Sequence, residues 1–240
     1  MDNEQPETGR RAFLVGSLVA VSGAAVASTG LLEAASASPQ TTRMKGAEAM
    51  KPPAVVGYTN TQGILIERAS YPARTLGTRI AAIVFKPAGF DLGKKYPAIV
   101  VTHPFGGVKE QTAGLYAARL AEQGFITLAF DKSYQGESGG EPRLMEVPGQ
   151  HLDDISSSID YLIQQPGVDA DHIGSLGVCA GGSYALGNAP TEMRIKAVAT
   201  VSLFDLGDAR RQAMGTLSYE ARMQRLKEIA AQRNKEAQGA

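Results

Sequence analysis

Apolar and polar residues alternate in two neighbouring stretches of the chain, residues 63–71 and 78–86. This period of two is typical of strands that bury one face, and the short segment between them predicts an antiparallel pair. Four later stretches are almost continuously apolar or small, which is typical of strands buried on both faces. These stretches are residues 97–102, 125–130, 173–178 and 195–201.

Two stretches between these strands have helical spacing. Apolar side chains recur on one face of residues 110–123, and Gly124 follows as a helix-ending residue. Residues 151–164 place Ile155 and Ile159 on one face before Pro166 ends the pattern. The alternation of strands and helices predicts an α/β fold, a mostly parallel sheet with helices on both faces.

One turn of this predicted fold carries candidate chemistry. The strand at 173–178 runs through Gly177, Cys179 and Gly181, the pattern G-x-C-x-G, into a helix. A strained strand-to-helix turn of this kind lifts a nucleophile above the sheet, and the glycines leave the backbone room to turn. The N–H of Ala180 would face a developing oxyanion, and the helix N-terminus would favour the thiolate. The alternative is a buried structural cysteine in a glycine-rich turn.

A second glycine-containing loop, residues 103–107, follows the strand at 97–102 and reads His-Pro-Phe-Gly-Gly. Its expected role is to supply the second oxyanion donor from a backbone N–H, that of Phe105 or Gly106. Pro104 is excluded because it has no N–H. The alternative is an ordinary tight turn.

Residues 131–140 follow the next strand and contain Asp131, Gly136, Ser138 and two further glycines. We expect Asp131 to order the turn by accepting hydrogen bonds from backbone N–H groups, rather than to act in catalysis. The spacing of the glycines does not fit a phosphate-binding loop, which argues against nucleotide binding.

Composition excludes several classes. The chain has 24 basic and 24 acidic residues, so its charge gives no sign of nucleic-acid binding. Its single cysteine permits no internal disulfide, and its three histidines are too scattered to predict a metal site. No cofactor is expected.

Together, the elbow and the two loops resemble those of dienelactone hydrolase-like α/β-hydrolases, in particular an exported bacterial subgroup. The resemblance covers roughly residues 55–201. It implies hydrolysis of a small-molecule ester, lactone or thioester through a covalent acyl-enzyme, with Cys179 as nucleophile and the N–H groups of Ala180 and Phe105 as oxyanion donors. His103-Pro104 stand where dienelactone hydrolases place a glutamate near the nucleophile.

The resemblance is incomplete at the end of the chain. In this fold the acid and the histidine of the triad follow the nucleophile, yet none of the three histidines follows Cys179. We expect His103 to order its loop, with a catalytic role as the alternative. His151 should lie at the surface, and His172 at the opposite end of the sheet from Cys179. The chain therefore looks C-terminally truncated, and its standing as an enzyme stays open: the alternative is an inactive hydrolase-fold protein, at most a binding module.

The expected domains are a signal peptide (1–37), a linker (38–53), a partial hydrolase domain (54–206) and a helical tail that would begin a cap or lid (207–240). Arg10-Arg11 before a mildly apolar run, with Ala35-Ser36-Ala37 after it, resembles a twin-arginine export signal. Export would place the protein in the periplasm or outside the cell, without stable membrane association after cleavage; an uncleaved anchor is the alternative. The apolar strand at 195–201 would form a sheet edge through which chains could associate.

Overall fold

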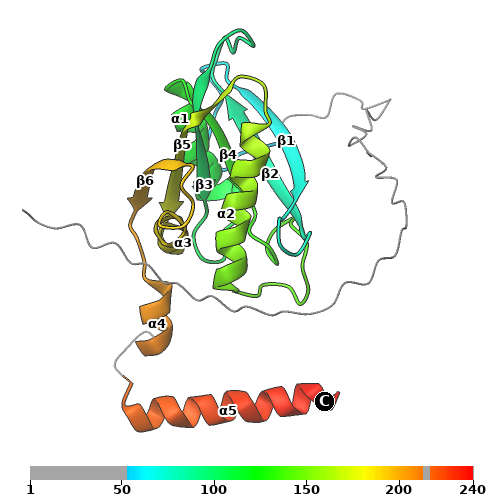
Figure 1. Ribbon diagram of the computed structural model, residues 1–240, viewed down its shortest axis with the longest axis vertical. Helices are drawn as coiled ribbons and strands as arrows, with labels where there is room; N and C mark the ends of the chain where they lie inside the picture. The colour runs from blue at the N-terminus through cyan, green and yellow to red at the C-terminus, as the bar shows by residue number, and fades with distance from the viewer. Residues whose placement is uncertain (1–52, 213–216, 240) are drawn as a thin grey trace, which may run out of the picture. The chain divides into compact units, whose positions relative to one another are not determined.

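The computed structural model describes residues 53–212 and 217–239. Its strands are β1 (Leu65–Pro72), β2 (Arg79–Lys86), β3 (Tyr96–Thr102), β4 (Ile126–Phe130), β5 (Val168–Val178) and β6 (Ile195–Val201). They form one sheet in the order β1-β2-β4-β3-β5-β6 (Figure 1). β2 is antiparallel to β1 and β4, and the other neighbouring strands are parallel. The predicted α/β sheet is confirmed.

The antiparallel pair is the predicted one, with Tyr71 opposite Ile80 across the turn. β2 nevertheless departs from the burial expected of an alternating strand, because it is buried on both faces over Ile80–Phe85. The reason is its place inside the sheet, between β1 and β4. β6 keeps one unpaired edge within the described sheet, as expected.

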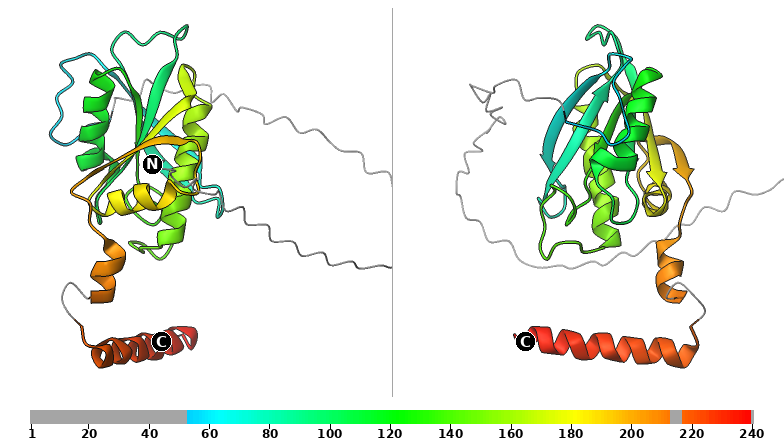
Figure 2. Two further views of the ribbon diagram at one scale, coloured as in Figure 1. Left: turned by 60° about the vertical axis from the view of Figure 1, so that its left-hand side comes forward. Right: turned by 180° about the vertical axis from the view of Figure 1, so that it is seen from behind.

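Helices cover both faces of the sheet (Figure 2). On one face, α1 (Gly114–Glu122) packs Ala117, Ala118 and Ala121 with Val101 of β3. On the other face, α2 (Pro148–Ile163) packs Ile155 and Ile159 with strand residues that include Val100, and α3 (Ala180–Asn188) adds Tyr184. Because successive side chains of a strand point to opposite faces, Val100 and Val101 enter different cores.

Helix boundaries differ slightly from the prediction. A short π-helical turn, η1 (Lys109–Ala113), precedes α1, and Gly124 ends that helix with φ 94°, as the sequence predicts. α2 begins at Pro148, three residues before the predicted start. Proline suits the first turn of a helix, because its missing N–H has no acceptor there in any case.

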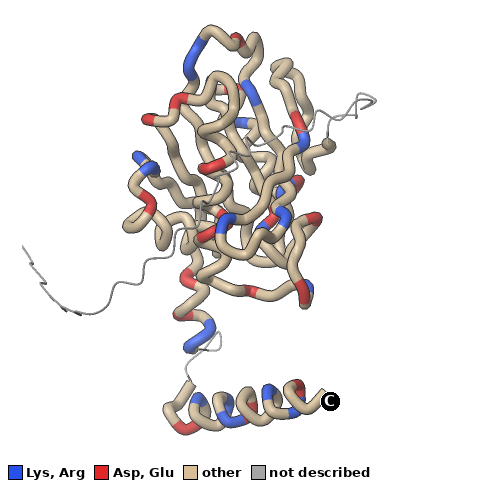
Figure 3. Tube along the Cα trace, turned by 45° about the vertical axis from the view of Figure 1, so that its right-hand side comes forward, with Lys and Arg blue, Asp and Glu red and all other residues tan. Residues whose placement is uncertain are grey.

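Two further helices, α4 (Leu206–Gln212) and α5 (Tyr219–Ala237), lie in the predicted helical tail. In α5, taken by itself, the Ser218 hydroxyl caps the start by accepting a hydrogen bond from the Ala221 N–H (3.1 Å), and basic and acidic residues are interspersed along its length (Figure 3). No helix in the described ranges is long and apolar enough to cross a membrane. That residues 207–240 begin a cap or lid stays a prediction. The predicted signal peptide and nearly all of the linker lie outside the described residues.

Candidate active site

Cys179 is the single residue between the end of β5 and the start of α3. Its backbone has φ 54° and ψ −121°, a conformation that residues with a side chain rarely adopt. Backbone hydrogen bonds hold it from both sides: its N–H donates to Val201 (2.9 Å), and its carbonyl accepts from Gly182 (2.9 Å) and Phe204 (3.2 Å). The thiol-bearing residue is partly exposed. This is the geometry expected of a nucleophile elbow, and it does not fit a buried structural cysteine.

The glycines of the elbow are required by close packing. A Cβ on Gly177 would collide with the backbone of Gly181 and Gly182. A Cβ on Gly181 would collide with the Thr102 carbonyl and lie 2.6 Å from the His103 carbonyl oxygen. The first turn of α3 therefore sits directly against the end of β3, and this contact brings the loop after β3 close to Cys179.

That loop is a tight turn in which the Gly107 N–H donates to the Pro104 carbonyl (3.1 Å), with Gly106 at φ 66°. Its tip projects Phe105, which is 55% exposed and lines one pocket together with Cys179. Within the described part of the chain, no hydrogen bond uses the N–H of Phe105 or of Ala180. Both N–H groups thus have no acceptor among the described residues.

His103 is buried and fully engaged. Its Nδ1 lies 2.7 Å from the Pro104 carbonyl, and its Nε2 accepts from the Lys132 N–H (3.2 Å). Burial, followed by the nearby Lys132 charge, lowers the pKa of His103 to about 3. A neutral ring with both nitrogens occupied cannot take a proton from Cys179, so the structure supports the loop-ordering role.

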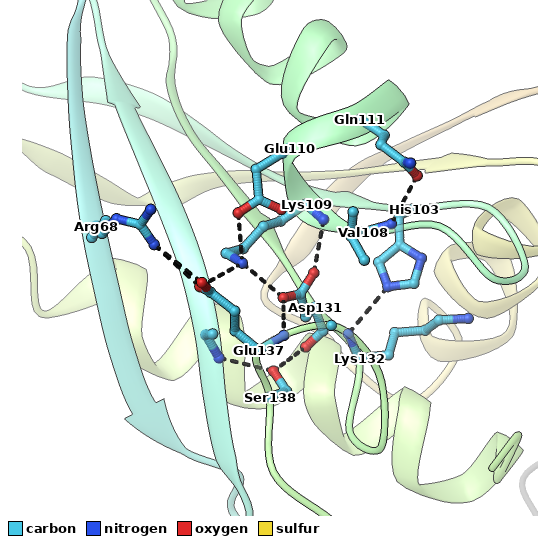
Figure 4. Close-up of polar contacts among 12 residues, drawn as sticks. Arg68, His103, Val108, Lys109, Glu110, Gln111, Asp131, Lys132, Glu137 and Ser138 are labelled. Carbon is cyan, nitrogen blue, oxygen red and sulfur yellow. Dashed lines mark hydrogen bonds and ion pairs between the residues drawn. The ribbon is translucent and has the colours of Figure 1, made fainter. Parts of the chain in front are cut away.

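Asp131 also has the structural role expected of it (Figure 4). Its carboxylate accepts from the backbone N–H groups of Lys109 and Glu137 (both 2.8 Å) and from the Lys109 ammonium (2.8 Å). The Lys109 ammonium also pairs with Glu110 (2.8 Å) and Glu137 (2.9 Å). This cluster joins the start of η1 to the loop after β4.

His151 contradicts the prediction that it lies at the surface: it is 0% exposed. The start of α2 is covered by the loop after β4, which the helical pattern of the sequence did not reveal. His151 Nδ1 lies 3.3 Å from an Asp154 oxygen, and its Nε2 lies 3.7 Å from Glu146. Burial alone would lower the pKa of His151, but the nearby carboxylates of Asp154 and Glu146 raise it. The same Nε2 lies 3.3 Å from the backbone nitrogen of Val147, and it could accept that N–H only if the ring were neutral. The two nearby carboxylates favour the protonated ring more strongly than this one contact favours the neutral ring.

Glu146 is the centre of this buried network and was missed by sequence reasoning. One carboxylate oxygen accepts from Tyr184 (2.7 Å) and Lys132 (3.2 Å), and the other accepts from Gln135 (2.8 Å). Burial opposes the charge, yet the neighbouring His151 ring and the Lys132 charge hold the pKa of Glu146 well below its ordinary value. Only the position of Lys132, two residues after the end of a predicted strand, gave any hint in the sequence.

His172 lies near the start of β5, exposed and bonded to Asp169 (2.8 Å), at the opposite end of that strand from Cys179. Among the described residues, no histidine is therefore placed to serve Cys179 as a base. The pocket beside Cys179 is lined by apolar side chains, including Phe105, Phe204, Leu206 and Ala209, and also by Arg210.

Comparisons with known proteins agree with this architecture. Escherichia coli uncharacterized protein YcjY is 52% identical over 128 residues, which are 53% of this chain and 42% of YcjY. Thiohydrolase aneE of Aspergillus aculeatus is 35% identical over 105 residues, 44% of this chain and 33% of aneE. The crystal structure of hypothetical protein PA2218 from Pseudomonas aeruginosa aligns with a TM-score of 0.72 at 36% identity, covering 76% of this chain and 56% of that one.

The chain thus spans less than half the length of these two curated relatives. The sequence pattern of the dienelactone hydrolase family matches residues 80–204, from β2 through the elbow to the residues after β6. With the sheet order, the elbow and the loop after β3 in their expected places, the chain belongs to the dienelactone hydrolase family of α/β-hydrolases.

Proposed function

We propose that Cys179 is the nucleophile of a hydrolase that cleaves ester, lactone or thioester bonds in small molecules through a covalent acyl-cysteine intermediate. The observation that carries this proposal is the backbone of Cys179, held at φ 54° with its residue partly exposed to an apolar pocket. A structural cysteine has no need of this conformation, whereas a nucleophile must stand clear of the sheet.

In the first step the thiolate sulfur attacks the carbonyl carbon, and the carbonyl π electrons move to oxygen. The N–H groups of Phe105 and Ala180 donate to that oxyanion. Its collapse forms the thioester to Cys179 and expels an alkoxide or thiolate, which takes up the proton that the Cys179 thiol had released; in a lactone this group stays attached to the acyl chain. Water then attacks the thioester, releases the carboxylic acid and returns the thiol. The relative named thiohydrolase supports including thioesters.

A specific observation favours a second candidate, a hydrolase fold that does not turn over. Within the described residues, the histidines are engaged elsewhere or lie far from Cys179. Such a protein would bind a substrate at most, because acyl transfer and hydrolysis both need proton transfer.

Turnover of p-nitrophenyl butyrate and of a butyryl thioester, with Cys179→Ala as the control, separates the two candidates. Sustained release that Cys179→Ala abolishes supports the hydrolase. Release of a single equivalent, with a butyryl adduct on Cys179 seen by mass spectrometry, shows an intact nucleophile without the deacylation machinery. Neither release nor adduct would support the inactive fold.

The intact mass of the protein isolated from its source cells bears on the same question. A mass well above that of the 240 residues would place the triad acid and histidine in further sequence. A mass matching residues 38–240 would favour the inactive candidate.

We also propose that the chain is exported by the twin-arginine pathway, on the basis of Arg10-Arg11 and the sequence that follows. Replacing both arginines by lysine should leave the protein in the cytoplasm, as measured by cell fractionation. Recovery of the unaltered protein in the membrane fraction at full length would instead support the anchor.

A further inference from the structure

Strand register brings Lys132 and Cys179 to the same edge of the sheet. Thr102 at the end of β3 is opposite Phe130 of β4 on one side and Gly177 of β5 on the other. Lys132 lies two residues beyond Phe130, and Cys179 lies two residues beyond Gly177. Their strands are two interstrand spacings apart, roughly 10 Å, a distance that a lysine side chain can largely span.

The side chain of Lys132 does reach across. Asp131 and Lys132 are adjacent in sequence but point in opposite directions, Asp131 toward Lys109 and Lys132 away from it (Figure 4). The Lys132 Nζ lies 4.9 Å from the centroid of the Tyr184 ring. Tyr184 belongs to α3, the helix that begins immediately after Cys179. The cation therefore lies against a side chain of the helix that begins directly after Cys179.

Lys132 is less well neutralised than the other buried lysine. Both ammonium groups are almost completely buried, but Lys109 pairs with three carboxylates. For Lys132, the described residues provide only Glu146 as a carboxylate partner, at 3.2 Å, and Glu146 also accepts from Tyr184 and Gln135. A buried cation with incomplete compensation gains from any further negative charge placed beside it.

The charged and titratable groups around Lys132 come from every neighbouring element. They are His103 after β3, Glu146 in the loop before α2, His151 and Asp154 in α2, and Cys179 and Tyr184 at α3. Burial lowers the pKa of Lys132, and Glu146, Asp154 and the Cys179 thiolate oppose that shift.

We propose that Lys132 is a positioning residue whose buried ammonium stabilises the thiolate of Cys179. This inference rests on the proposed function in that Cys179 is the nucleophile. It assigns to the residue after Asp131 a role in nucleophile activation that does not depend on a histidine.

The test is the rate of alkylation by iodoacetamide as a function of pH, measured on the full chain. Cys179 is the only cysteine, so the signal reports that residue alone. With Lys132→Gln, we expect the rate at pH 7 to fall about tenfold and the midpoint of the profile to move up by about one pH unit, the effect of losing a neighbouring opposite charge. Lys132→Arg, which keeps the charge, should restore most of the rate.

Lys86→Gln is the matched control, because Lys86 also pairs with one glutamate, Glu67 at 2.7 Å, but lies on β2. Its alkylation profile should equal that of the unaltered protein. A Lys132→Gln profile identical to the unaltered one would overturn the proposal. If Lys132→Gln fails to fold, the alkylation profile of the unaltered protein is measured in the folded state and in urea. A folded-state midpoint at or above the midpoint in urea would also overturn the proposal.

The alkylation readout is independent of turnover. Lack of ester cleavage with an intact Lys132 effect would refute the proposed function alone. Turnover through Cys179 without a Lys132 effect would refute this inference alone.

Discussion

At the scale of single residues, the elbow works because two glycines let backbone approach backbone. Cys179 itself holds a conformation that costs of order 1–3 kcal/mol, and the hydrogen bonds to Val201, Gly182 and Phe204 keep it there. Gly181 lets α3 begin directly against the carbonyls that end β3. The strain and the close packing are therefore two parts of one local arrangement.

Gly181→Ala should destabilise the protein by about 1–3 kcal/mol, because its new methyl group has to displace the main chain of Thr102 and His103. Urea unfolding followed by circular dichroism measures the loss. Gly149→Ala is the matched control: that glycine lies in the first turn of α2 with nothing within 4 Å of its added Cβ. It should leave stability unchanged or raise it by about 0.5 kcal/mol. Equal effects of the two substitutions would contradict the packing argument.

The buried histidine makes stability depend on pH. The folded-state pKa of His151 lies above its ordinary value of 6.5. The stabilisation that the protonated His151 gives the folded protein is therefore complete below pH 6.5. The contribution is lost as the pH rises through the folded-state pKa. The advantage of the unaltered protein over His151→Gln in urea unfolding should therefore shrink from pH 6 toward more alkaline pH.

His172→Gln, at an exposed position, provides the comparison and should show no such trend. An advantage that instead grows above pH 6.5 would mean that the folded protein holds His151 neutral, with Nε2 accepting from the Val147 N–H.

At the scale of elements, the chemistry gathers where parallel strands end. β3, β4 and β5 finish in register, so the loops after them begin side by side. Asp131 then ties the loop after β4 to the start of η1 through the backbone N–H and the ammonium of Lys109, and it holds the loop itself through the N–H of Glu137. The sheet thus aligns the loops, and the Asp131 cluster fixes their conformations.

Asp131→Asn should destabilise the protein by about 3 kcal/mol, because it removes a buried partner of the Lys109 ammonium. Urea unfolding gives the magnitude, and limited proteolysis should cut faster within residues 132–147. Asp153→Asn is the control: Asp153 bonds to Thr75 at the surface, and its loss should cost less than about 1 kcal/mol. Unchanged proteolysis of the loop in Asp131→Asn would argue against its ordering role.

At the scale of the whole molecule, the described sheet has an unprotected side. β6 pairs with β5 along one edge only, and its residues are half-buried or exposed throughout. Unpaired N–H and carbonyl groups on a strand of low charge are a template for pairing with another chain.

We therefore predict that the chain self-associates through β6. Ala199→Lys, at an exposed position of that strand, should shift the protein toward monomer in size-exclusion chromatography with light scattering. Ala88→Lys adds the same charge at an exposed loop position far along the chain, and should leave the distribution unchanged. A monodisperse monomer of the unaltered chain would refute the prediction.

The sequence was most informative where a local pattern has a single structural solution. The elbow motif, the glycine that ends α1 and the order of strands and helices are of this kind, and each lies where it was predicted. Predictions based on one element alone did less well. His151 looked like a surface residue because its own helix gives no sign of the loop that covers it, and Glu146 lies in a stretch without periodicity.

The sequence by itself determined the α/β fold, the position of Cys179 at a strand-to-helix turn and the resemblance to the dienelactone hydrolases. These follow from side-chain periodicity and from the backbone freedom of glycine, which act over a few residues. Only the tertiary structure decided which charges are buried and which partners they meet. Lys132 meets Glu146 and Tyr184, and His151 meets Asp154, inside the folded protein. These contacts depend on strand register and on loop packing between elements that are distant along the chain.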